Sequence, residues 1–509
     1  MNKKLKIFIT IAITLFFEIF MYFQLISNKI EDSGKSKMVQ LIFIGLCLVT
    51  NVLLFIVYRI MKKKNNLKIE NVFLIISVCF GMIYLFFIPS MLGTDELPHF
   101  LRSYQISVGD VVVKNPEKNS TYIPRGLSEI TNMSEFSKRY SKDKIFESTD
   151  YKDKVKILNS NVTSIKYSPI PYLPQIIGFK LAKLLRLSPI FTLFCVRSVN
   201  FLTWLFFGYL AIRLLPSKKI FATILYTSPA VLSLVSTCSG DTFALGMMFL
   251  MFAYILNMIK NGKKVSKVDY AILLALSLGL STYKMFYVLY ILLLFIIPKK
   301  SFKNTYHKLL FVCSIFSLSI ALDYFWFYLT SINSTIQNPV VTKQLHFIFS
   351  HPFYYFMTFI NTFAQDLYYY ISNIVGGSEM CYSIVRLNQI FVIPYLIILV
   401  SLYYDGEKNV KLCTLSKTLI VVICCLIIGL VSTAMYLDWT SHKLGIGSNI
   451  IIGVQARYFI PLIIPIISIL PNVKKKIKIN NKLYFLVILL DALLVINTIN
   501  SILIALVQS

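Results

Sequence analysis

The chain has 509 residues, of which 56% are hydrophobic and only 15% are charged, and its mean hydropathy is +0.69. A soluble protein of this length would carry about 25% charged residues, so the composition excludes an ordinary soluble enzyme. The formal net charge of +28 is a property of many nucleic-acid-binding proteins as well. The positions of the basic residues decide between the two classes.

Apolar runs of the length of a membrane helix recur along the whole sequence. A hydrocarbon core of roughly 30 Å requires about 20 apolar residues per helix, and the pattern predicts thirteen spans. The expected fold is therefore an all-α polytopic membrane protein. The predicted spans are 7–27, 38–60, 71–91, 188–212, 219–236, 240–259, 268–281, 284–298, 309–330, 387–404, 418–437, 456–471 and 483–506.

Lysine and arginine gather in alternate loops between these spans. The loop at 474–482 contains five lysines, whereas Lys343 is the only lysine or arginine in the segment 331–380. Because basic loops stay on the cytoplasmic side, this alternation predicts a cytoplasmic N-terminus and an external C-terminus. The charge is then a topology signal with some attraction to anionic lipid, and no nucleic acid is expected as a partner.

This topology divides the chain into five segments. Two of them face outward: a large first external loop with a polar excursion, and a later stretch whose tyrosines and phenylalanines favour the headgroup zone. The other three are membrane spans. The segments are 1–91 (three spans), 92–187 (external loop), 188–330 (spans), 331–386 (aromatic interfacial segment) and 387–509 (C-terminal spans).

Four charged side chains follow the third predicted span directly, in the sequence Asp95-Glu96-Leu-Pro-His99-Phe-Leu-Arg102. Charge beside lipid is costly to maintain and is usually functional. A carboxylate there would act as a general base toward an acceptor hydroxyl or hold a divalent cation. The alternative is structural: Asp95 caps a helix, and its neighbours form salt bridges at the interface.

The external loop ends in Tyr167-Ser-Pro-Ile-Pro-Tyr-Leu-Pro-Gln175. Three prolines in six residues forbid a regular helix and favour extended backbone. Such backbone is excluded from lipid, so the stretch either lines a cavity within the protein or forms a stiff connector into the next helix. The sequence supports both interpretations equally.

A third motif, with Gln455, Arg457 and Tyr458, precedes a late span. An arginine at this level suits a phosphate, because its planar fork donates two hydrogen bonds to oxyanion oxygens. The alternative is an arginine that extends to the interface beside a belt tyrosine. Asp241 and Lys284 also fall at the outer ends of predicted spans, so we expect these residues to border one cavity with Asp95.

These motifs occur in an order that resembles a known family. Asp-Glu-x-Pro-His-Phe-x-Arg-x-Tyr, Tyr-Ser-Pro-x-x-Tyr-x-Pro-Gln, Ser-x-Asp and Gly-Val-Gln-x-Arg-Tyr-Phe-x-Pro are similar to those of a bacterial family of multispanning membrane proteins of unknown function. That family is commonly grouped with the GT-C glycosyltransferases. The resemblance covers roughly residues 70–470, and one departure is Ala456, where the family pattern has glycine.

The resemblance implies a GT-C-like arrangement of about thirteen helices in the bacterial plasma membrane, with the active site on the extracytoplasmic side. It implies an inverting transferase that moves a sugar from a polyprenyl-phosphate donor to a glycan, lipid or protein acceptor. Asp95 matches the catalytic acid of the first external loop, and Glu96 would assist it or hold Mg²⁺ or Mn²⁺ with it. The expected substrate-binding residues are His99, Arg102, Tyr167, Gln175, Asp241, Lys284, Gln455, Arg457 and Tyr458.

Two other classes of function fit a basic, aromatic-rich, multispanning chain. A transporter or flippase of lipid-linked glycans would place charge through the membrane depth and often shows repeat symmetry, whereas here the charge gathers at one face. A non-catalytic subunit of an envelope assembly would tolerate the loss of Asp95.

Overall fold

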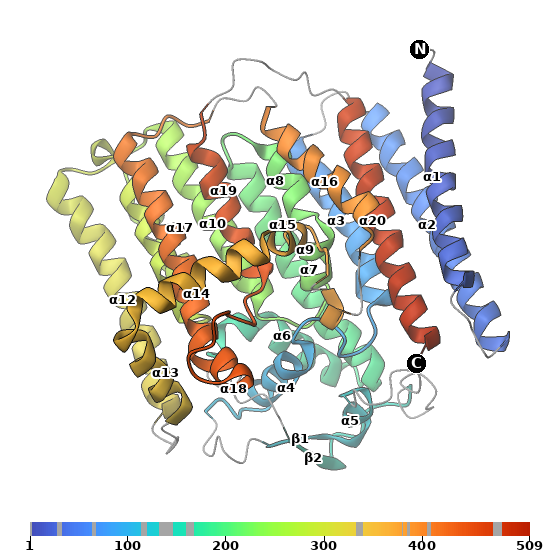
Figure 1. Ribbon diagram of the computed structural model, residues 1–509, viewed down its shortest axis with the longest axis horizontal. Coiled ribbons are helices and arrows are strands. Elements are labelled where there is room, and N and C mark those ends of the chain that lie inside the picture. Colours follow the sequence, from blue (N-terminus) through green and yellow to red (C-terminus); the bar gives the residue numbers. More distant parts are fainter. Residues whose placement is uncertain are drawn as a thin grey trace.

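The protein is a bundle of helices with a small polar unit at one end (Figure 1). The computed structural model describes residues 3–27, 33–63, 68–112, 120–131, 146–158, 167–331, 339–378, 380–383, 387–404, 409–471 and 481–508. The long helices are α1 (Lys3–Ser27), α2 (Ser33–Lys63), α3 (Ile69–Phe87), α7 (Pro189–Leu214), α10 (Asp241–Asn261), α12 (Thr305–Ser331), α17 (Thr414–Met435) and α20 (Asn481–Gln508).

Shorter helices fill the bundle and cover its ends. They are α4 (Glu96–Ser107), α5 (Arg125–Thr131), α6 (Leu173–Leu184), α8 (Lys219–Tyr226), α9 (Pro229–Val235), α11 (Lys267–Ser281), α13 (Pro339–Ser350), α14 (Pro352–Gln365), α15 (Leu367–Asn373), α16 (Gln389–Ser401), α18 (Ser441–Leu444) and α19 (Ile460–Ile469). Single turns or 3₁₀ segments are η4 (Ile170–Tyr172), η5 (Met285–Ile296), η6 (Lys299–Ser301), η7 (Met380–Ser383), η8 (Leu402–Tyr404), η9 (Tyr436–Thr440, π-helical) and η10 (Ala456–Tyr458).

The polytopic membrane class predicted from composition is confirmed. Within the described residues, 7 helices are long and apolar enough to cross a membrane. They cover Lys37–Val57, Ile69–Phe87, Pro189–Leu214, Asp241–Asn261, Thr305–Thr330, Thr414–Leu444 and Ile488–Ala505.

The remaining predicted spans are shorter or broken. Apolar helices occupy Thr14–Ser27, Met285–Ile296, Gln389–Ser401 and Ile460–Ile469, and α11 has only 15 residues. The predicted span 219–236 is wrong as one continuous helix: it forms α8 and α9, of 8 and 7 residues. Pro229 begins α9 because proline has no N–H to continue α8. The break is buried in protein, where non-helical backbone is tolerated.

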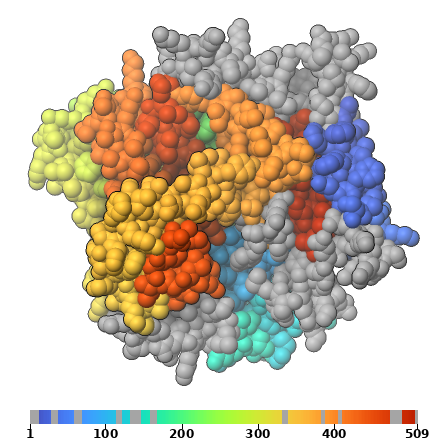
Figure 2. Space-filling model, in the orientation of Figure 1, coloured from blue at the N-terminus to red at the C-terminus, as the bar shows by residue number. Residues whose placement is uncertain are grey.

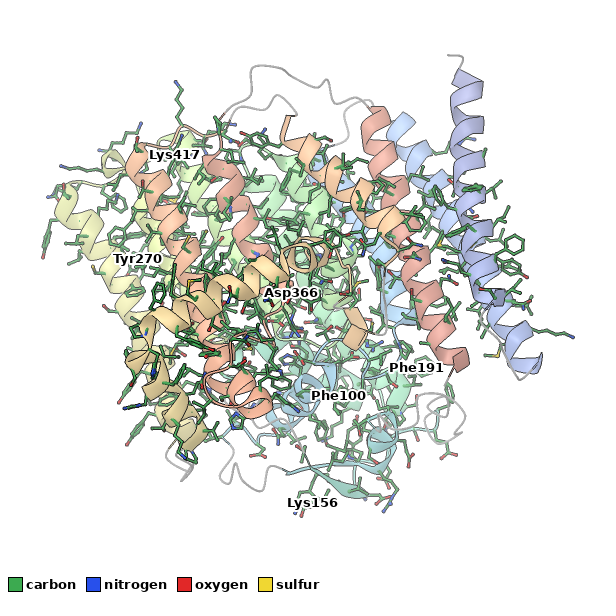
Figure 3. The ribbon with its side chains drawn as sticks, viewed as in Figure 1. Phe100, Lys156, Phe191, Tyr270, Asp366 and Lys417 are labelled. Atoms are coloured by element: carbon green, nitrogen blue, oxygen red, sulfur yellow. The ribbon has the colours of Figure 1, made fainter. Side chains whose placement is uncertain are left out.

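The basic connections between helices share one end of the bundle, which we call the basic end. Lys219 Nζ donates to the carbonyl of Arg213 and Lys260 Nζ to that of Pro216, at 2.9 and 3.1 Å. Lys218 Nζ reaches the carbonyl of Tyr403 at 2.6 Å. Lys417 marks this end in Figure 3, far from Lys156 at the opposite one. The predicted basic loop at 474–476 lies outside the described residues, as does Lys64.

The opposite end, the site end, carries the small polar unit with the two strands. Its β1 (Ser120–Pro124) and β2 (Lys154–Leu158) pair antiparallel, with Ser120 opposite Leu158 and Pro124 opposite Lys154. Much of the predicted polar excursion, residues 113–119, 132–145 and 159–166, lies outside the described residues.

The predicted aromatic segment forms α13, α14 and α15, which cross the front of the bundle obliquely (Figure 2). Their outward side is rich in aromatic residues, with Phe349 and Phe353 at 77% and 75% exposure. An apolar outward surface on a helix suits contact with lipid.

We predict that the site end is extracytoplasmic. A cysteine replacing Ser148, on the exposed loop before β2, should react with a membrane-impermeant maleimide in intact cells, because the basic end stays inside. A cysteine replacing Lys263 should react only after permeabilisation. The unsubstituted chain, whose Cys413 is exposed, gives the background. Labelling at position 263 in intact cells, with 148 protected, would reverse the topology.

Candidate functional site at the site end of the bundle

A tight turn after α3 places Asp95 at the site end. Gly93 packs against Thr237 so closely that a Cβ at position 93 would lie 2.6 Å from the threonine side chain. Asp95 itself has φ +56°, in the left-handed region, which aspartate tolerates better than most residues. From this turn the Asp95 side chain contacts Arg457.

Glu96 is held elsewhere. It is completely buried, and its two oxygens accept from Arg197 Nε and Nη2 of α7, both at 2.7 Å. The backbone N–H groups of Gly93 and Cys238 complete its shell at 3.2 and 3.0 Å. The structure therefore separates Glu96 from its neighbour Asp95 and gives it a structural pair. The predicted two-carboxylate metal site does not fit, because no oxygen of Glu96 is left to face a cation.

Arg197 also binds the end of α3. Its Nη1 donates to the carbonyl of Ile88 at 2.6 Å, and its Nη2 to that of Pro89 at 2.9 Å. These carbonyls have no helical partner at the end of a helix, so one buried guanidinium satisfies α3 and fixes α4. Sequence reasoning missed Arg197. The available signal was a lone arginine in an apolar span, which is costly unless it is paired.

Four of the expected residues do converge, although Asp95 and Lys284 line neither of the two cavities beside them. Arg457 forms an ion pair with Asp95 and lies 3.5 Å from Asp241, measured from Nη1 to Oδ2. Lys284 Nζ contacts Asp241 Oδ1 at 2.7 Å. The residues come from four parts of the chain, and two cations face two carboxylates. We call Asp95, Asp241, Lys284 and Arg457 the charged cluster.

Within this cluster the two acids differ in exposure. The Asp241 side chain is 8% exposed, whereas that of Asp95 is 35% exposed. Burial alone would raise the pKa of Asp95, but the charge and hydrogen bond of Arg457 outweigh it and hold that pKa below its usual value. Burial opposes the charge of Arg457, yet Asp241 and Asp95 raise its pKa well above normal. Both groups are therefore ionised at neutral pH.

An aromatic wall surrounds the cluster. His99 Nδ1 is 2.7 Å from the Tyr172 hydroxyl, and the His99 ring stacks on Tyr167 with centroids 6.2 Å apart. Lys284 Nζ lies over the rings of Tyr458 and Tyr283, at 4.4 and 4.8 Å. Such rings attract cations and exclude water. Tyr283 belongs to this wall although the sequence did not single it out; its position beside Lys284 was the only signal.

Three of the expected substrate-binding residues, Arg102, Gln175 and Gln455, belong to neither the charged cluster nor the aromatic wall. Arg102 donates to the backbone carbonyl of Tyr167 at 3.3 Å, and Gln175 Nε2 joins Asn200 Oδ1 at 2.7 Å. These two are buried and position other groups. Gln455, next to the cluster in sequence, has a buried side-chain oxygen that forms no hydrogen bond with the described residues.

Two cavities meet at Arg457. Both are open to solvent, and the empty space in and around them amounts to about 430 Å³ for the larger and about 240 Å³ for the smaller. Within the described part of the chain, Nε and Nη1 of Arg457 are buried and have no hydrogen-bond partner. The larger cavity is lined by Ile88, Gly93, Thr94, Ala230, Ser233, Leu234, Asn373, Gly376, Met380, Cys381 and Arg457, and the smaller by Leu234, Asp241, Ala244, Leu245, Tyr287, Arg457 and Pro461.

Comparison with known families agrees with this architecture. The family model described as "Predicted membrane protein (DUF2142)" matches residues 78–466. The chain belongs to this family. No curated protein and no solved structure matches it. The DUF2142 match covers every member of the charged cluster and the whole aromatic wall, whereas α1, α2 and α20 lie outside it.

We predict that Glu96 is needed for stability. Replacing it by Gln leaves the buried Arg197 charge unpaired, which typically costs about 3–5 kcal/mol, so the purified Glu96→Gln protein should melt well below the unsubstituted one in detergent. Glu147→Gln, at an exposed acid on the same end, is the control and should leave the melting temperature unchanged. Equal melting of both variants would contradict the structural role.

A second prediction concerns acid stability. Burial lowers the pKa of His99 to about 4 from an ordinary value of 6.5, so between these values the unfolded chain binds a proton that the folded one does not. Folded stability must then fall as pH decreases from about 6.5 toward 4, by about 2 kcal/mol at pH 5. Asparagine can keep the contact with Tyr172 without titrating, so His99→Asn should lose less stability between pH 7.5 and 5.

Thermal unfolding at several pH values measures this difference. The control is His346→Asn, at an exposed histidine, which should retain the full acid dependence. If His99→Asn and the unsubstituted chain lose the same stability between pH 7.5 and 5, His99 is not a buried neutral group.

Proposed function

We propose that this protein is a membrane glycosyltransferase that moves a sugar from a polyprenyl-phosphate donor to an envelope glycan, lipid or protein acceptor at the site end. The proposal rests on the surroundings of the Arg457 guanidinium. Its side chain is 9% exposed and borders both cavities. Its Nε has no hydrogen-bond partner among the described residues, and its Nη1 has only the 3.5 Å ion pair with Asp241. Donors left unmet beside a cavity suit an oxyanion ligand, and a bidentate arginine favours phosphate.

The cavities support a lipid-linked donor. The larger one is lined mainly by apolar side chains, including Ile88, Leu234 and Met380, which suit the first isoprene units beyond a phosphate. Lys284 supplies a second cation, which shares Asp241 with Arg457. The anionic phosphate would thus lie at the charged cluster and the tail in an apolar cleft.

Asp95 is the residue best placed to act on the acceptor. It is the most exposed carboxylate of the cluster, and its neighbours Gly93 and Thr94 line the larger cavity. In the proposed step, Asp95 takes the proton of an acceptor hydroxyl while that oxygen attacks the anomeric carbon of the donor sugar. The bond from this carbon to the phosphate oxygen breaks, and the phosphate leaves with the electron pair.

The ion pair between Asp95 and Arg457 couples donor binding to this step. A donor phosphate competes with Asp95 for the guanidinium, so its arrival would release the carboxylate to accept a proton. Arg457 and Lys284 then stabilise the negative charge that develops on the leaving phosphate, which is the kind of preorganised electrostatic contribution that dominates many enzymes. The proposed mechanism has no step through a metal ion.

We expect Asp95→Asn to lower transfer by about 10²–10⁴-fold, the usual contribution of a general base. The assay uses the full-length protein in liposomes, polyprenyl-phosphate glucose, mannose and arabinose labelled in the sugar, and an envelope extract from cells that lack this protein. Released polyprenyl phosphate and label in the acceptor fraction are both measured. Asp438→Asn, at an acid of the same end that is 54% exposed, is the control.

The same assay separates the alternatives. Arg457→Lys should also be slow, because a point charge does not reproduce a bidentate phosphate contact, while the melting temperature of Asp95→Asn should stay near that of the unsubstituted chain. Transport of intact labelled donor across the liposome membrane, without cleavage, would favour a flippase. Full transfer by Asp95→Asn would remove Asp95 from the mechanism.

A further inference from the structure

The helix α6 lies against the beginning of α7 and leaves one face uncovered. Gly178 packs on Val196 so closely that a Cβ at position 178 would lie 2.7 Å from the Val196 Cα, and Gln175 pairs with Asn200. Lower numbers on α6 therefore meet higher numbers on α7, so the two helices are antiparallel. The C-terminal end of α6 lies at the outermost turn of α7, near Phe191 (Figure 3).

The uncovered face of α6 is apolar. Leu173, Ile177, Leu181 and Leu184 recur at helical spacing along it and are 40–76% exposed. Phe191 of α7, 54% exposed, continues this surface toward the part of α7 that can cross a membrane. Exposed apolar surface that is continuous with a membrane span lies against lipid in a polytopic protein.

A basic group follows the same face toward the end of the helix. Lys180, Lys183 and Arg186 are exposed, and none of them forms a salt bridge with another described residue. The sequence from 167 to 188 contains no acidic residue. Lys180 and Lys183 follow one edge of the apolar stripe at a spacing of three, and Lys183 Nζ lies 5.6 Å from the centre of the Tyr151 ring.

The other charges near this group belong to the loop before β2. The Thr149 hydroxyl donates to the carbonyl of Leu187 at 2.8 Å, which brings the exposed acids Glu147 and Asp150 toward the end of α6. Arg186 has φ +51°, where glycine is the usual residue at the end of a helix. Arg186 therefore places a cation beside the last carbonyls of α6, and the partial negative charge of this helix end attracts it.

We propose that α6 forms a binding site for an anionic phospholipid in the leaflet at the site end. The apolar stripe would contact the acyl chains, and Lys180, Lys183 and Arg186 would bind the headgroup phosphate. The position of these residues along α6 supports a phospholipid. The apolar stripe begins at the end of α6 that lies deeper in the bundle, and the three cations lie toward the other end, at the edge of the bundle. Cations next to an anionic lipid surface contribute independently of any reaction, so the site does not depend on sugar transfer.

Lipid binding to the full-length chain in neutral detergent tests the proposal. Dioleoyl phosphatidylglycerol should raise the melting temperature more than dioleoyl phosphatidylcholine, and native mass spectrometry should show retained phosphatidylglycerol. The combined variant Lys180→Gln, Lys183→Gln, Arg186→Gln should bind it at least about tenfold more weakly. The matched control Lys152→Gln, Lys154→Gln, Lys156→Gln removes the same charge from exposed residues around β2 and should bind normally.

The outcomes are distinct. Equal loss in both triple variants would show unspecific attraction to net charge, and an unchanged preference in the α6 variant would overturn the site. Stabilisation by inorganic phosphate at the same concentration would overturn the lipid as occupant. All six side chains are exposed, so the melting temperature without lipid should stay constant and a folding defect would be visible directly.

Discussion

The site depends on one buried ion pair, between Glu96 and Arg197. Two unit charges without access to water are costly to bury, and here each is surrounded by hydrogen bonds: the carboxylate by two backbone N–H groups, the guanidinium by carbonyls at the end of α3. The pair joins α3, α4 and α7 to the turn at Cys238. With these elements held in place, the adjacent residue Asp95 contacts a different arginine, Arg457.

The neighbouring carboxylates of Glu96 and Asp95 therefore have different surroundings. Glu96 is inaccessible and fully paired, whereas Asp95 is partly exposed and held by a single arginine. An aspartate with one strong partner can be released when a competing anion binds that partner. The two cations and two carboxylates of the charged cluster have no net charge, so the cluster is stable without a ligand. Its two cations can still bind a phosphate.

Broken elements surround this cluster. The broken helix α8–α9 and the 3₁₀ helix η5 both extend between the basic end and the site end. Both are largely buried. Irregular backbone at this depth occurs where it lines protein cavities, and the two cavities do border α9 and Tyr287 of η5. The side chains of Asp241, Lys284 and Arg457 are nearly buried beside these tyrosines, which strengthens the interactions among the three, whereas Asp95 remains 35% exposed.

The sequence by itself determined the membrane class, the alternation of basic loops and the set of residues that converge. Hydrophobic run length and the high cost of charge near lipid are local properties, so Asp95, Asp241, Lys284 and Arg457 could be selected without a structure. Only the tertiary structure decided their roles. Arg457 lies 362 positions from Asp95 along the chain, and no local pattern encodes which acid it meets. The same holds for Glu96, whose partner Arg197 lies on another helix, and for α8 and α9, whose break is permitted only because other helices bury it.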